Sequence, residues 1–255
     1  MIGIFDSGVG GITVAKAIET FCPQSPLIYF GDIAHSPYGS KSPEIIMDYS
    51  RRNIDFLVKQ GATAVVIACN TAAAVASEAL RREYSVPIFD VVTATVERAA
   101  ASTVNKKIGV IGTRATVRSK VYEQRIHAIK PDCRIVSQAC PLLVSLIEEN
   151  WLTKRETKMI LRRYLYPLRL LQLDTLILGC THYPLLSKLI QQRIGRKVRL
   201  IDSSREAALH LKAFLDRSPN IASGRASSNN QNKDEKQKTS PFSSHHPSSR
   251  FFVSD

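Results

Sequence analysis

Two short stretches of the chain resemble each other, and each carries a cysteine at the same place. Residues 65–71 read VVIACNT and residues 176–182 read LILGCTH, and helix-like patterns follow over 72–82 and 185–193. Apolar runs of this length are typical of strands buried on both faces of a parallel sheet. We therefore expect Cys69 and Cys180 where a strand ends and a helix begins, which is where open α/β sheets bind ligands. The positive end of the helix dipole would lower the pKa of each thiol.

The other strand-like runs also form two similar sets. The runs at 2–5, 27–30 and 86–92 are matched by those at 107–113, 134–136 and 197–202. The separations are 106 residues from Ile4 to Val110, 107 from Tyr29 to Val136 and 111 from Cys69 to Cys180. Elements that recur in the same order at a nearly constant separation indicate an internal duplication.

The duplication predicts an α/β fold of two doubly wound parallel-sheet domains with similar topology. The first domain comprises residues 1–95 and 204–255, and the second comprises residues 96–203. If a pseudo-twofold axis relates them, the two cysteines line a cleft between the domains from opposite sides. A single continuous sheet is the alternative.

The end of the chain has a different composition. A helix is expected after Asp202, to about Leu215. Residues 218–249 are rich in Ser, Asn, Gln, Lys and Pro, which predicts a mobile linker. Residues 250–255 are apolar again, and they are either an edge strand that docks on the first sheet or a frayed terminus.

Composition and charge argue against several classes of protein. No apolar run approaches the roughly 18 residues of a membrane helix, and a strand pattern starts at Ile2 without a leader. The five cysteines form no CxxC pair, and an odd number of cysteines without an export signal leads us to expect reduced thiols in the cytoplasm. The net charge of +13 comes from scattered basic residues without an aromatic platform. This favours solvated helix faces over a nucleic-acid site, and an anionic substrate is equally compatible.

A glycine-rich turn, DSGVGG at residues 6–11, joins the first strand to a helix expected over 12–21. Such a turn lets backbone N–H groups approach an anion closely. No Gly-Lys-Ser/Thr follows, and the full dinucleotide spacing is missing. The turn therefore indicates an anionic ligand and not a nucleotide cofactor.

Two cysteines at strand ends fit four kinds of chemistry. They could form a disulfide, which the expected compartment disfavours. Together with His182 they could bind a metal ion, although a fourth ligand is not evident. One thiol could be a nucleophile with a passive partner. The last option is a pair of acid/base groups on opposite faces of one carbon, which is what inversion of a stereocentre requires.

Several motifs resemble those of the glutamate racemase family, cofactor-independent enzymes that make D-glutamate for peptidoglycan. The matching segments span most of the chain to about Asp202: FDSGVGG at 5–11, PYG at 37–39, ACNT at 68–71, CP at 140–141, EE at 148–149 and GCTHYP at 179–184. The cysteine motifs are shared with the wider aspartate/glutamate racemase superfamily. The DSGVGG opening together with CTHYP points to the glutamate branch.

The resemblance implies roles for individual residues. Cys69 and Cys180 would be the catalytic pair, Asp6 and His182 would assist them, and Glu148 would lie near His182. Residues implied to bind the substrate are Asp6, Ser7, Pro37, Tyr38, Gly39, Cys69, Asn70, Thr71, Thr113, Cys180, Thr181 and His182. Tyr38 and Gly39 would close over the side-chain carboxylate. No cofactor or metal ion is implied; the expected partners are glutamate and a second copy of the chain in a homodimer.

Other interpretations stay open at this point. The substrate could be aspartate or another amino acid, or the chain could be a regulatory protein that binds DNA gyrase. Asp6 could be a helix cap, and His182 a neutral histidine bonded to backbone. The chain also departs from the family pattern: Ile33 replaces a common threonine, Arg114 replaces a usual proline, and the final helix is missing.

Overall fold

The computed structural model describes residues 1–218 and 249–254. Apart from its two end residues, the linker expected over 218–249 therefore lies outside the described residues. Within the described part, none of the helices is both long enough and apolar enough to span a bilayer.

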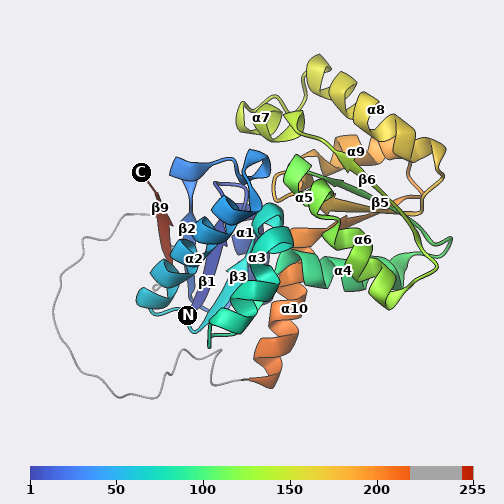
Figure 1. Cartoon of the computed structure of the whole chain (residues 1–255). Helices are drawn as coiled ribbons and strands as arrows, with labels where there is room; N and C mark the ends of the chain where they lie inside the picture. Colours follow the sequence, from blue (N-terminus) through green and yellow to red (C-terminus); the bar gives the residue numbers. More distant parts are fainter. Residues whose placement is uncertain (219–248, 255) are drawn as a thin grey trace, which may run out of the picture.

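The strands form two separate, all-parallel sheets (Figure 1). The first has the order β4-β3-β1-β2-β9, with β1 Ile2–Asp6, β2 Leu27–Gly31, β3 Ala64–Ile67, β4 Ile88–Asp90 and β9 Arg250–Val253. The second has the order β6-β5-β7-β8, with β5 Lys107–Gly112, β6 Arg134–Ala139, β7 Thr175–Gly179 and β8 Arg199–Asp202. Read from its other edge, the second sheet has the order β8-β7-β5-β6. This order corresponds strand by strand to β4-β3-β1-β2 of the first sheet. The two-domain α/β fold is confirmed, and the single continuous sheet is wrong.

Helices cover the faces of both sheets. They are α1 Ile12–Phe21, α2 Pro43–Lys59, α3 Asn70–Glu83, α4 Val91–Ser102, α5 Arg114–Ser119, α6 Val121–Ile129, α7 Leu142–Glu148, α8 Arg155–Leu170, α9 Ser187–Ile194 and α10 Ser203–Arg217. Three short 3₁₀ helices join them: η1 Ile33–His35, η2 Tyr38–Ser40 and η3 Tyr183–Leu186. The start of α2 shows why a helix begins at this point of the sequence. Ser42 accepts a hydrogen bond from Ile45 N–H as the N-cap residue, and Pro43 takes the first helical position.

Two boundaries differ from the sequence prediction. Residues 91–92, expected in a strand, belong to α4, because the Asp90 carboxylate accepts a hydrogen bond from Thr93 N–H at 2.7 Å and caps a helix there. The helix expected from 185 begins as η3, and α9 starts only at Ser187. The domain boundary expected between 95 and 96 falls inside α4, and the division of the chain into domains stays a prediction.

The two sheets share one of two apolar clusters among the residues that the structure describes, while a second cluster, which includes Ile111 and Leu178, belongs to the second sheet and its helices. The shared cluster of buried side chains includes Ile67 of β3, Val110 of β5 and Ile177 of β7. The helix α10 follows the second sheet in the chain but packs on both α1 and α4 (Figure 1). The strand β9 pairs with β2, so residues 250–253 dock on the first sheet as an edge strand. This packing holds the carboxyl ends of β3 and β7 close to one cavity.

Candidate active site

Cys69 follows β3 and is the N-cap residue of α3, as expected. Its sulfur accepts a hydrogen bond from Ala72 N–H at 3.5 Å and donates to Ser7 Oγ at 3.4 Å. The side chain is 5% exposed. Burial and the nearby Asp6 carboxylate raise the pKa of the Cys69 thiol to about 11, and the hydrogen bonds with Ser7 and Ala72 oppose this rise only in part. The expected lowering of the thiol pKa is therefore wrong, because desolvation exceeds the effect of the helix end.

Cys180 occupies the equivalent position after β7, but a 3₁₀ helix follows it. The residue is 6% exposed. Burial raises the pKa of its thiol, the charges of Cys69 and Asp6 add to this rise, and the backbone N–H of His182 opposes it. Thr13 of α1 donates a hydrogen bond to the carbonyl of Thr181 at 3.0 Å, which ties the Cys180 loop to the first sheet.

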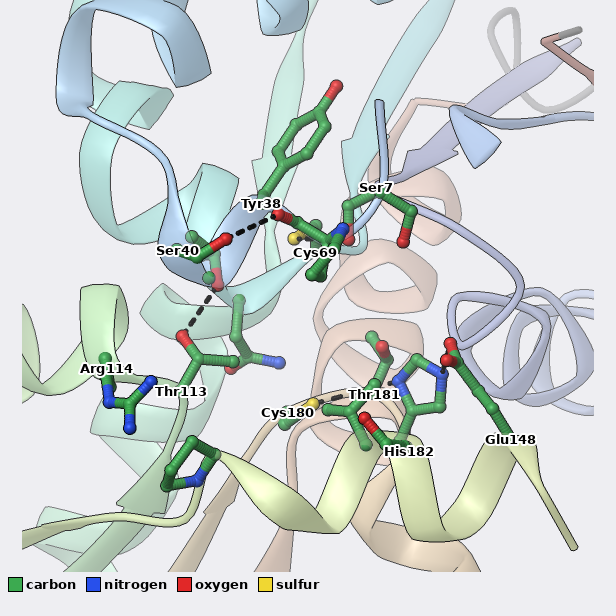
Figure 2. A pocket seen from close by; sticks show the side chains of 18 residues that line it. Ser7, Tyr38, Ser40, Cys69, Thr113, Arg114, Glu148, Cys180, Thr181 and His182 are labelled. Carbon is green, nitrogen blue, oxygen red and sulfur yellow. Dashed lines mark hydrogen bonds and ion pairs between the residues drawn. The ribbon is translucent and has the colours of Figure 1, made fainter. Parts of the chain in front are cut away.

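His182 lies between the Cys180 sulfur and a carboxylate. Its Nδ1 is 3.8 Å from Cys180 Sγ, and its Nε2 is 3.1 Å from Glu148 Oε1 (Figure 2). The ring is buried, with 7% exposure. Both ring nitrogens face side chains, so the interpretation of His182 as a histidine bonded to backbone is wrong. Of the two adjacent glutamates, Glu148 at the end of α7 is the one beside His182.

Asp6 ends β1 and is completely buried. Its Oδ2 accepts a hydrogen bond from Gly8 N–H at 3.0 Å, and its Oδ1 accepts one from Thr181 at 3.5 Å. Burial raises the pKa of the Asp6 carboxyl, against the lowering effect of His182. The N-cap of α1 is Gly11, without a side-chain cap, so Asp6 is not the cap of that helix.

One cavity of about 270 Å³ contains both cysteines (Figure 2). Its lining residues are Ser7, Ser36, Pro37, Tyr38, Gly39, Ser40, Cys69, Asn70, Thr71, Thr113, Arg114, Pro141, Val144, Ser145, Glu148, Cys180, Thr181 and His182. Every site residue implied by the sequence is among them except Asp6, which lies behind the cavity. Elements from both sheets therefore form a single site.

The polar lining residues are fixed by their own contacts. Thr71 Oγ1 lies 2.9 Å from Thr113 Oγ1, which joins the start of α3 to the start of α5. Asn70 Oδ1 accepts a hydrogen bond from the Tyr122 hydroxyl at 2.6 Å. The ring of Tyr38 points away from both sulfurs (Figure 2), and its hydroxyl donates to Asp32. The hydroxyl of Tyr38 is thus directed into the first domain and away from the cavity.

Sequence reasoning missed six lining residues. They are Ser36, Ser40, Arg114, Pro141, Val144 and Ser145. Val144 and Ser145 precede Glu148 by four and three residues on α7, so helical periodicity could have found them. Arg114 follows Thr113 at the start of α5, where it stood out only as a departure from a family motif.

Among the described residues, the cysteines form neither a disulfide nor part of a metal-binding group. All five cysteines are free thiols. Within residues 1–218 and 249–254, no group of three or more His, Cys, Asp or Glu side chains is arranged to hold a metal ion.

Comparisons with known proteins agree with this site. A family model described as Asp/Glu/Hydantoin racemase matches residues 12–211. A glutamate racemase of Geobacter metallireducens is 49% identical over 207 residues, which cover 81% of this chain and 77% of the relative. The structure of a Bacillus anthracis glutamate racemase is similar with a TM-score of 0.83 and 38% identity, covering 86% of this chain and 82% of that chain. A Francisella tularensis glutamate racemase in complex with D-glutamate gives a TM-score of 0.84 at 33% identity, covering 100% and 88%.

Proposed function

Because the chain belongs to the glutamate racemases of the Asp/Glu/Hydantoin racemase family, we propose that it interconverts L- and D-glutamate with Cys69 and Cys180 as its two bases. It is an isomerase, and D-glutamate is a component of peptidoglycan. The relative from Francisella tularensis has D-glutamate bound.

The observation that supports the two-base mechanism most directly is the shared cavity. The two sulfurs come from equivalent strands of different sheets, yet both line the same 270 Å³ space. Inversion at a carbon needs one group to remove a proton from one face and another to return a proton to the opposite face. A small amino acid held between the two sulfurs meets that requirement.

Each thiol has its own acid/base partner for proton transfer. Cys69 lies beside Ser7, with the Asp6 carboxylate nearby. Cys180 faces His182, whose far nitrogen is 3.1 Å from Glu148. The Glu148 carboxylate orients the imidazole, which places His182 to exchange a proton with Cys180.

Substrate binding accounts for how buried thiols with raised pKa values can act as bases. Burial disfavours the thiolate form of both cysteines because it removes the charge from water. A bound glutamate brings an α-ammonium group, and a positive charge within about 4–6 Å favours the charged form of a thiol. We therefore expect the reactive thiolate to form in the complex with substrate.

The cavity lining offers donors for both substrate carboxylates. The starts of α3 and α5 meet at Thr71 and Thr113, whose hydroxyls and backbone N–H groups suit an anion. Ser7, Asn70 and Thr181 complete the set on the other sides. In this proposal Pro37, Tyr38 and Gly39 form the wall next to the side-chain carboxylate, with Tyr38 contributing through its backbone.

Deuterium uptake in heavy water tests the mechanism. We expect product glutamate to carry deuterium at Cα in both directions, while recovered substrate stays protonated early in the reaction. Cys69→Ala and Cys180→Ala should each abolish racemisation. Cys140→Ala is the matched control, since Cys140 is equally buried but does not line the cavity. Racemisation that survives Cys69→Ala, or product that retains the substrate's own hydrogen, would contradict the two-base mechanism.

A substrate panel separates glutamate from other amino acids. We expect aspartate to fail, because its side chain is one methylene shorter and cannot reach the wall at Gly39 while Cα sits between the sulfurs. Equal rates with aspartate and glutamate would refute this specificity.

We also propose a cytoplasmic location and a homodimer. The five free thiols fit a reducing compartment. Light scattering on the purified protein measures the mass in solution, and a 28.3 kDa species at all concentrations would rule out the dimer.

A further inference from the structure

The carboxyl-terminal strand β9 docks next to the segment that forms one cavity wall. It pairs in parallel with β2 and forms the edge of the first sheet. Just past β9, the backbone N–H of Ser254 donates to the carbonyl of Gly31 at 3.1 Å. At the other end of the strand, Arg250 donates to the carbonyl of Gln60 at 2.7 Å. This pairing places Ser254 beside the start of residues 32–40.

The Ser254 hydroxyl connects the strand to a buried carboxylate. It donates to Asp32 Oδ1 at 2.8 Å and accepts a hydrogen bond from Ala34 N–H at 3.0 Å. The side chain of Asp32 is nearly inaccessible, and His35 Nδ1 lies 2.7 Å from the same oxygen. The second oxygen, Oδ2, accepts the Tyr38 hydroxyl. One carboxylate therefore links the end of the chain to both η1 and η2.

The short helix η2 is the part of this network that faces the substrate cavity. Tyr38, Gly39 and Ser40 all line the cavity. On the opposite side stands Thr113 at the start of α5. A Cβ atom on Gly39 would come within 2.9 Å of Thr113 Cβ, so the two walls already touch there. Any displacement of η2 consequently changes the width of the cavity.

We propose that Ser254 is a positioning residue for the substrate: through Asp32 and Tyr38 it holds η2 at the distance from Thr113 that glutamate requires. The inference rests on the proposed function, because it concerns the same cavity. Ser254 does not line the cavity itself. Without its hydroxyl, Asp32 Oδ1 keeps only His35, and η2 gains freedom to move outward.

The inference predicts an effect on substrate binding more than on turnover. The two cysteines are held by β3 and β7, which Ser254 does not contact. For Ser254→Ala we expect KM for glutamate to rise about tenfold, as fits the loss of a hydrogen bond to a charged group. We expect kcat to stay within about twofold, because the sulfurs keep their geometry. Ser254→Thr retains the hydroxyl and should restore the wild-type KM.

Val253→Ala is the matched control on the same strand. The Val253 side chain is 56% exposed, so its removal trims β9 without touching Asp32. We expect wild-type KM and kcat from this variant. The inference is overturned if Ser254→Ala leaves KM unchanged, or if Val253→Ala raises KM by the same factor.

A double-mutant cycle tests the route through Tyr38. Tyr38→Phe removes the hydroxyl that joins η2 to Asp32, so Ser254→Ala should then have little further effect on KM. Fully additive effects would refute the route. If the wild-type chain does not racemise glutamate, the proposed function fails, and calorimetric binding of D-glutamate to the same variants decides the inference. Absence of binding, or equal affinities for wild type and Ser254→Ala, would overturn it.

Discussion

Gly10 is packed so closely against His182 that a single added methyl group tests the role of the imidazole. A Cβ built on Gly10 would lie 2.4 Å from His182 Cε1, 2.5 Å from Nδ1 and 2.5 Å from Thr181 Oγ1. Carbon atoms in contact prefer about 3.5 Å, so the ring must move by about 1 Å or the loop must shift. Gly10 does not have a positive φ, and alanine is therefore compatible with the backbone there.

We expect Gly10→Ala to reduce kcat strongly while the protein still folds. A displacement of about 1 Å in a catalytic arrangement costs on the order of 10²-fold in rate. Overpacking of a buried site costs about 1–3 kcal/mol of unfolding free energy. The rate loss arises because the ring shift changes the distance of 3.8 Å between His182 Nδ1 and Cys180 Sγ.

Gly8→Ala is the matched control in the same turn. Its added Cβ would meet Ser36 Oγ at 3.3 Å, a contact that a small rotation relieves. Circular dichroism of glutamate solutions gives kcat and KM for both variants, and thermal melting gives their stability. The reasoning is refuted if Gly10→Ala turns over at the wild-type rate, or if Gly8→Ala is impaired to the same extent.

Two further predictions concern charged side chains. Asp90 is 2% exposed and forms ion pairs with Arg81 and Arg125, so chemical denaturation should show Asp90→Asn to be about 3–5 kcal/mol less stable. Burial alone would raise the Asp90 pKa, but Arg81, the Thr93 N–H and Arg125 together lower it. The Asp90 carboxylate therefore stabilises the fold fully above about pH 4, and this stabilisation is lost as the pH falls below that value. Thermal melting at a series of pH values should show this loss for the wild-type protein and not for Asp90→Asn. Glu148→Gln keeps a hydrogen-bond acceptor for His182 but removes the charge, so the rate should fall. In Glu148→Gln, the primary isotope effect with α-deuterated glutamate should rise more for one enantiomer than for the other, because Glu148 acts through His182 on Cys180 only. Equal increases for the two enantiomers would argue against a role at Cys180 alone.

Much of the site could be predicted because its signals are local. The apolar runs before Cys69 and Cys180 determine a buried strand, and the polar residues after them begin a new element. The cavity contains both cysteines as expected. The prediction failed where two local signals compete: at Asp90 the side chain caps a helix and ends the strand two residues early.

The thiol pKa values show a second kind of limit. The helix end beside Cys69 is visible in the sequence, and it does donate a hydrogen bond to the sulfur. How much water the cavity walls exclude depends on segments from both sheets, and burial raises the pKa to about 11. Desolvation is a property of the whole site, so no local pattern reports it.

The sequence by itself determined the duplicated α/β fold, the two cysteine positions and the glycine-rich turn, because strand burial and turn chemistry are set by neighbouring residues. Only the tertiary structure decided that Glu148 faces Nε2 of His182, that Gly39 touches Thr113, and that Ser254 reaches Asp32. Such contacts join residues that are 34 to 222 positions apart, as the Glu148–His182 and Asp32–Ser254 pairs do. They depend on packing between elements that are distant in the chain, and the Gly39–Thr113 contact also depends on how the two sheets come together. Packing of this kind leaves no periodic trace in the sequence.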